Sequence, residues 1–112
     1  MPTLELNRGD LEFLLGTHLP EDVEKLNEIL AYVKGEVKGV DDEEIRIELK
    51  DSNRADIWSV EGLARALRGF LGLEVGLKEY RLAGSSGVEV YVNPKLENIR
   101  PYIACAVVKA SS

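Results

Sequence analysis

The stretch IRIELKDSNRADIWSVEGLARAL, residues 45–67, changes its hydrophobic period halfway along. Apolar and charged residues alternate at its start, which predicts a half-buried strand that ends near Lys50. From about Asp56 to Leu71 the apolar residues instead recur at helical spacing, and Gly72 follows. One face of this predicted helix carries Ile57, Val60, Leu63, Leu67 and Leu71. A strand that leads directly into an amphipathic helix is therefore the central unit of the expected fold.

The residues before this unit predict a partner strand and a further helix. Residues 36–40 can pair antiparallel with the strand at 45–50 through an acidic turn at Asp41 and Asp42. A helix is expected from about Pro20 to Lys34, because proline suits the first helical position and acidic residues follow it. Its expected buried face carries Val23, Leu26, Ile29, Leu30 and Val33.

The amino-terminal residues predict a short strand near Leu4 to Leu6, followed by a helix of one or two turns. Asn7 is the expected N-cap and Gly16 the expected end of this helix. Its apolar stripe is expected to consist of Leu11, Leu14 and Leu15. Together these elements predict an α+β domain, in which about three helices pack on a short, mainly antiparallel sheet.

A Gly- and Ser-rich connection follows, and it places a domain boundary after residue 83. Val88, Val90 and Val92 alternate as in another strand, and residues 93–100 favour a turn or short helix. Residues 101–110 are apolar on both faces, which is typical of a strand covered on both sides. We expect residues 1–83 to form one domain and residues 84–112 to be a linker and the first strands of a longer one.

The composition excludes several classes of protein. The net charge of −6 counts against a free-standing nucleic-acid-binding domain, whose affinity would come largely from Lys and Arg. No apolar run approaches the length of a membrane span, and the first residues do not resemble a signal peptide. One cysteine, Cys105, and one histidine, His18, cannot form a zinc cluster or an internal disulfide, which suits the reducing cytosol.

Candidate catalytic residues are few, and each has a plainer interpretation. His18 is expected in a surface loop, and Cys105 is expected to be a small buried apolar side chain in the last strand. The carboxylates at 41–44 favour a solvated turn over a cation site. Basic and tyrosine residues after residue 77 could form a binding patch for single-stranded RNA, but scattered positions on the surface explain them better. These residues are Lys78, Arg81, Lys95 and Arg100, with Tyr80, Tyr91 and Tyr102.

Polar residues gather just before the predicted helix at 56–71. Asn53, Asp56 and Ser59 are all N-capping types, yet one cap needs only one of them. With Arg54 between them and Trp58 following, they favour a polar network that joins strand and helix. Arg54 or Arg65 can pair with Asp56, and we expect Arg54 to point inward. No nucleophile and base are paired here, so the pattern favours a structural role.

Residues 51–67 also resemble a signature of the N-terminal region of phenylalanyl-tRNA synthetase β subunits. The pattern of that family is Thr-Asn-Arg-Pro-Asp, two residues, Ser, two residues, Gly, an aliphatic residue and Ala-Arg. Ser52 and Ala55 replace its usual Thr and Pro. Residues 91–110 resemble the beginning of the editing domain of the family, and residues 4–16 its archaeal and eukaryotic form. The matching positions are Asn53, Arg54, Asp56, Ser59, Gly62, Ala64 and Arg65.

The resemblance implies a part of a cytoplasmic heterotetramer of two α and two β subunits, which attaches phenylalanine to its tRNA with ATP and Mg²⁺. It implies that aminoacylation occurs in the α subunit and that the β subunit carries an editing domain, so this stretch holds no catalytic, cofactor-binding or metal-binding residue. Its role would be architectural, with the α subunit and the rest of the β subunit as partners. The structural motif comprises Asn53, Arg54, Asp56, Ser59, Gly62 and Arg65.

Two other functions stay open on the sequence. The first is a tRNA-binding accessory module in which Arg54, Arg65 and Arg68 contact tRNA, with Arg65 and Arg68 as the possible contacts to tRNA or to a partner. The second is a free-standing synthetase-like protein that binds an unrelated partner.

Overall fold

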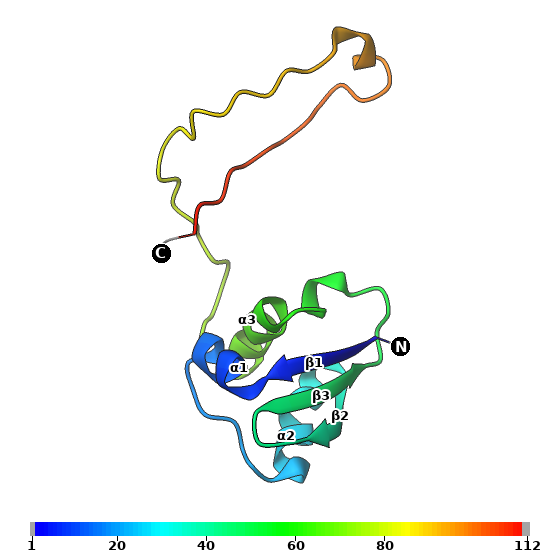
Figure 1. Ribbon diagram of the computed structural model, residues 1–112, viewed down its shortest axis with the longest axis vertical. Coiled ribbons are helices and arrows are strands. Elements are labelled where there is room, and N and C mark those ends of the chain that lie inside the picture. The colour runs from blue at the N-terminus through cyan, green and yellow to red at the C-terminus, as the bar shows by residue number, and fades with distance from the viewer. Residues whose placement is uncertain (1, 111–112) are drawn as a thin grey trace. The chain divides into compact units, whose positions relative to one another are not determined.

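The computed structural model describes residues 2–110, which divide into two units at the bond between Leu77 and Lys78 (Figure 1). Secondary structure is concentrated in the first unit, which holds a three-stranded sheet and the helices α1 (Arg8–Leu15), α2 (Val23–Leu30) and α3 (Val60–Phe70). This arrangement confirms the predicted α+β class. The domain boundary predicted after residue 83 stays a prediction.

The sheet consists of β1 (Thr3–Asn7), β2 (Gly35–Val40) and β3 (Glu44–Leu49) in the order β1-β3-β2, with both pairs antiparallel. Leu4 lies opposite Ile47 and Leu6 opposite Ile45, so the apolar residues of the two strands share one face. The other face is charged: Glu5 lies opposite Arg46, and their side chains form an ion pair of 3.5 Å. The strands predicted within residues 1–50 are confirmed, and helices cover the apolar face.

The turn between β2 and β3 is the expected acidic hairpin turn. The Asp41 side chain accepts hydrogen bonds from the backbone N–H groups of Glu43 (3.0 Å) and Glu44 (2.8 Å). These two backbone donors lower the pKa of Asp41, because they stabilise its ionised form. The acidic residue therefore organises the turn through its own backbone.

Helix α1 (Arg8–Leu15) begins and ends where the sequence predicts. The Asn7 side chain accepts a hydrogen bond from the backbone N–H of Asp10, and Gly16 adopts the left-handed conformation at φ +85°. Leu11 and Leu15 are buried, but Leu14 is 37% exposed. The predicted apolar stripe is therefore wrong at Leu14, since only Leu11 and Leu15 belong to the core.

Helix α2 (Val23–Leu30) starts later than predicted and continues as the 3₁₀ helix η1 (Ala31–Val33). Asp22 is its N-cap, because the Asp22 side chain accepts a hydrogen bond from the backbone N–H of Glu24. The predicted start at Pro20 is wrong, since the carbonyl of Pro20 is held by the Arg8 side chain at 2.6 Å. Val23 is also not part of the buried face, because it is 43% exposed.

The helix predicted from Asp56 is divided in two. A 3₁₀ helix, η2 (Ala55–Ile57), precedes α3 (Val60–Phe70), and Ser59 is the N-cap of α3. Ser59 has extended backbone angles, so it separates the two helices. The predicted start at Asp56 is therefore wrong by about one turn, although Ile57 is buried as expected.

The core lies between the sheet and the three helices. It contains apolar residues from α1, α2 and α3, from the 3₁₀ helices η1 and η2, and from β1 and β3. Its members are Leu6, Leu11, Leu15, Leu19, Leu26, Leu30, Val33, Ile45, Ile47, Leu49, Ile57, Leu63, Ala64 and Leu67.

The second unit, residues 78–112, contains the 3₁₀ helix η3 (Pro94–Leu96) and otherwise irregular, exposed chain within its described part. The strands predicted at 88–92 and 101–110 are absent from residues 78–110, and Cys105 is exposed instead of buried. A strand needs a neighbour for its backbone hydrogen bonds, and these residues supply none to one another.

Candidate functional site

Arg54 and Asp56 form a bidentate ion pair at the surface. The Arg54 guanidinium donates from Nε to Asp56 Oδ1 at 2.8 Å and from Nη2 to Oδ2 at 2.7 Å. The pair lowers the pKa of the Asp56 carboxyl, chiefly through the hydrogen bonds from Arg54. The two side chains are 49% and 61% exposed. The expected inward orientation of Arg54 is therefore wrong, although its predicted pairing with Asp56 is confirmed.

Ser59 and Gly62 make the junction between η2 and α3. The Ser59 hydroxyl accepts a hydrogen bond from the backbone N–H of Gly62 at 3.1 Å. Gly62 also lies directly against the backbone of η2: a Cβ at this position would stand 1.7 Å from the carbonyl oxygen of Asp56. Only a residue without a side chain fits this approach. The polar motif thus joins two helices, with one cap and one obligatory glycine at its centre.

The junction predicts that the cap matters more than the ion pair. Replacing Ser59 by Ala removes the acceptor of the Gly62 N–H and should lower the free energy of unfolding by about 1 kcal/mol. Replacing Arg54 by Ala should cost less, because both partners of its ion pair are solvated and screened by salt. Urea denaturation of the two variants checks this order. A larger loss for Arg54→Ala would mean that the ion pair, and not the cap, holds the junction.

The other two arginines of α3 differ in exposure. Arg65 is exposed, and it interacts with other groups of the protein. Arg68 is partly buried: its Nη1 donates to the carbonyl of Leu15 at 2.6 Å, and its Nε donates to Glu74 at 3.0 Å. Arg68 therefore ties the end of α1 to α3 and to the segment that follows α3. Contact of either arginine with tRNA stays a prediction.

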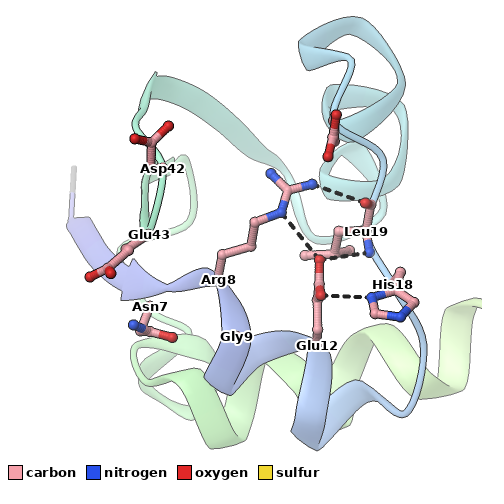
Figure 2. A pocket seen from close by; sticks show the side chains of 9 residues that line it. Asn7, Arg8, Gly9, Glu12, His18, Leu19, Asp42 and Glu43 are labelled. Atoms are coloured by element: carbon pink, nitrogen blue, oxygen red, sulfur yellow. Dashed lines mark hydrogen bonds and ion pairs between the residues drawn. The ribbon is translucent and has the colours of Figure 1, made fainter.

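A hollow of about 590 Å³ lies beside the loop that joins α1 to α2 (Figure 2). Glu12 reaches this loop from α1: its Oε1 accepts from the backbone N–H of Leu19 at 3.1 Å, and its Oε2 lies 2.9 Å from Nδ1 of His18. Arg8 donates to Glu12 Oε1 at 3.1 Å and to the carbonyl of Leu19 at 2.9 Å. The ion pair of Arg8 and Glu12 thus holds both a backbone N–H group and backbone carbonyl groups of the loop.

The opposite side of the hollow is acidic. Asp42 and Glu43 line it from the turn between β2 and β3 (Figure 2). Glu21 lines it from the loop that precedes α2. Within residues 2–110 no group of three or more His, Cys, Asp or Glu side chains is arranged to hold a metal ion. His18 contacts the carboxylate of Glu12, and its side chain is 96% exposed. The contacts of Arg8 and Glu12 in the hollow hold the loop between α1 and α2 in place.

This fastening makes a pH-dependent contribution to stability. The hydrogen bond with His18 is the largest cause that lowers the pKa of Glu12, and the Leu19 N–H and Arg8 lower it further, against partial burial. A carboxyl whose pKa is lower in the folded state stabilises the fold above its unfolded-state pKa, about 4.3, and loses this effect as the pH falls through the folded-state value.

Glu12→Gln should therefore lower the free energy of unfolding by roughly 1–2 kcal/mol at pH 7. The difference between wild type and variant should shrink below about pH 4, where the wild-type carboxyl is protonated as well. Urea denaturation at a series of pH values measures it. A difference that stayed constant down to pH 3 would show that the charge of Glu12 does not act in this way.

Sequence reasoning missed the fastening of this loop. The spacing of Arg8 and Glu12, four residues apart on a helix, was a usable signal for their ion pair. No sequence signal pointed to the backbone groups of Leu19 and Pro20 as their partners. No sequence signal pointed to the close approach of Gly62 to Asp56 either, because the sequence pattern predicts η2 and α3 as one continuous helix.

Among residues 2–110, no helix has both the length and the apolar character that crossing a membrane requires.

No family model matches the chain. Comparisons with individual proteins consistently give one kind of relative. Over 97% of its length the chain is 40% identical to the phenylalanine–tRNA ligase β subunit of Pyrococcus abyssi and 42% identical to that of Pyrococcus furiosus. A crystal structure of an N-terminal fragment of the phenylalanyl-tRNA synthetase β subunit from Pyrococcus horikoshii is similar, with a TM-score of 0.70 and 37% identity over 90% of this chain and 29% of that one. The chain spans about a fifth of the length of the curated relatives that it matches.

Proposed function

Because nearly all of this chain is homologous to the N-terminal region of archaeal phenylalanyl-tRNA synthetase β subunits, we propose that it is a non-catalytic, architectural domain of such an enzyme. The observation that carries the architectural role is the junction at residues 54–62. There the residues of the family motif pair with each other, cap α3 and accommodate the close approach of Gly62. Each of these contacts holds the fold together.

The substrates and partners of the parent enzyme are part of this proposal. It would attach phenylalanine to its tRNA with ATP and Mg²⁺ in the cytoplasm, as a heterotetramer of two α and two β subunits. Residues 2–110 do not fit a metal ion, since no suitable group of ligands occurs among them. In this proposal ATP and Mg²⁺ bind elsewhere in the enzyme, and this domain contributes to assembly.

The second unit supports a position next to a further domain. Val88, Val90 and Val92 alternate along exposed chain, and apolar residues 101–108 are exposed as well. Such segments form strands when another sheet supplies hydrogen-bond partners and apolar cover. We propose that the editing domain of the β subunit supplies both.

The test compares variants of the intact enzyme, purified as the complex of full-length α and β subunits. Gly62→Ala should reduce the yield and thermal stability of the complex, while the assembled fraction keeps its kcat for aminoacylation and for editing. Gly69→Ala, in the same helix but with no atom within 4 Å of an added Cβ, should reduce neither the yield nor the thermal stability of the complex. Full assembly of the Gly62→Ala enzyme with a collapse of either reaction would overturn the architectural role.

The exposure of Arg54 gives some support to a tRNA-binding role. If that role were correct, the complex with Arg54→Ala would bind tRNA more weakly, with a smaller dependence on salt. We expect equal affinity for wild type and Arg54→Ala at low salt, because the net charge of the chain is −6.

A further inference from the structure

Tyr32 and Phe70 form a stacked aromatic pair on the surface of the first unit. Their ring centroids are 5.4 Å apart, and the ring planes differ by 12°. Tyr32 comes from η1 and Phe70 is the last residue of α3, so the pair joins the ends of two helical segments. Both residues lie outside the core cluster, and they are 54% and 55% exposed. Half of each large ring therefore faces solvent.

The chain that follows Phe70 adds more exposed apolar residues. Leu73 is 45% exposed, Val75 87% and Leu77 90%. The start of this segment is held to the end of α3, since the backbone N–H groups of Leu73 and Glu74 both donate to the carbonyl of Arg68. We call Tyr32, Phe70, Leu73, Val75 and Leu77 the exit face, because the chain leaves the first unit there.

We propose that the exit face is an interdomain docking surface, and that its occupant is an apolar surface of a domain further along the same polypeptide. This inference rests on the proposed function. The curated relatives are about five times as long as this chain, which covers 20% of them. In a subunit of that length, most of the polypeptide lies outside residues 1–112.

Tethering favours this occupant over a separate chain. A domain tethered to the exit face through residues 78–112 meets it at an effective concentration that a separate chain does not reach, so a weaker apolar contact suffices to keep it docked. Stacked aromatic residues suit such a contact, because they offer a large rigid area and lose little side-chain entropy on binding. An exposed pair of packed aromatic residues is also typical of surfaces that another protein surface covers.

The first experiment measures whether the exit face is covered. Full-length β subunit in complex with its α subunit is labelled with a photogenerated carbene, and labelling is quantified by mass spectrometry. Tyr32 and Phe70 should be labelled at least fivefold less than Phe13, a control residue on α1 that is 85% exposed. Labelling of all three in proportion to their exposed fractions would overturn the proposal.

The second experiment identifies the occupant. A photoreactive benzoylphenylalanine replaces Phe70 in the full-length subunit, and Phe13 in the control. After irradiation of the complex, the Phe70 position should cross-link to residues beyond 112 of the same polypeptide. Cross-links to the α subunit or to a second β subunit, or none at all, would overturn the proposal.

Neither readout depends on aminoacylation, so the two proposals can fail separately. An uncovered exit face in an active, assembled enzyme contradicts the docking surface alone. A full-length protein that does not assemble with an α subunit contradicts the proposed function, whatever covers the exit face.

Discussion

Replacing Gly62 by Ala is expected to lower the free energy of unfolding by about 3 kcal/mol, the upper part of the range for overpacked sites. An added Cβ would stand 1.7 Å from the carbonyl oxygen of Asp56 and 2.9 Å from its carbonyl carbon. Both atoms are backbone, so no side chain can rotate away. Either η2 or the first turn of α3 must move, and buried Ile57 and Leu63 would move with them. Urea denaturation followed by circular dichroism measures the loss.

Gly69→Ala is the matched control for this substitution. Gly69 lies in the same helix, and a Cβ there would meet no atom within 4 Å. Alanine has the higher helix propensity, so this variant should be more stable than wild type by up to about 1 kcal/mol. Equal effects of Gly62→Ala and Gly69→Ala would show that the approach of η2 to α3 does not constrain residue 62.

The second large effect is expected at Leu11. Its side chain is fully buried between α1 and the rest of the core, and truncation to Ala should cost about 3 kcal/mol through lost burial and the cavity that remains. Leu14 lies one turn away on the same helix and is 37% exposed. Leu14→Ala should therefore cost less than about 1 kcal/mol.

The variants Leu11→Ala and Leu14→Ala distinguish the burial that the structure shows from the burial that the sequence pattern predicts. Hydrophobic spacing alone places both leucines in one apolar stripe, and it would give them similar losses. Thermal and urea unfolding of both variants decide between the two. Similar losses would mean that α1 is rotated about its axis relative to the orientation described here.

Local patterns were enough to place most elements of the first unit. Alternation identified β3 and its partner β2, and the Asn7 cap with Gly16 bounded α1. The family motif was also visible in residues 53–65. These features depend on residues within a few positions of one another, which is why the sequence can specify them without tertiary contacts.

Predictions failed where a distant group competed with a local one. Pro20 looked like a helix start, but the Arg8 side chain holds its carbonyl and Asp22 caps α2 instead. Asp56 looked like the start of α3, yet it belongs to a separate 3₁₀ helix. The strands predicted after residue 87 need hydrogen-bond partners that residues 78–110 do not supply to one another.

Sequence patterns are sufficient for the α+β class, for the hairpin of β2 and β3, and for the resemblance to synthetase β subunits. The roles of the motif residues depend on tertiary contacts. Gly62 is required because a carbonyl six residues earlier in the chain lies against it, and Arg54 stays at the surface because Asp56 satisfies it there. Such contacts depend on the orientation of η2 between β3 and α3. The hydrophobic periodicity of β3 and of α3 does not specify that orientation.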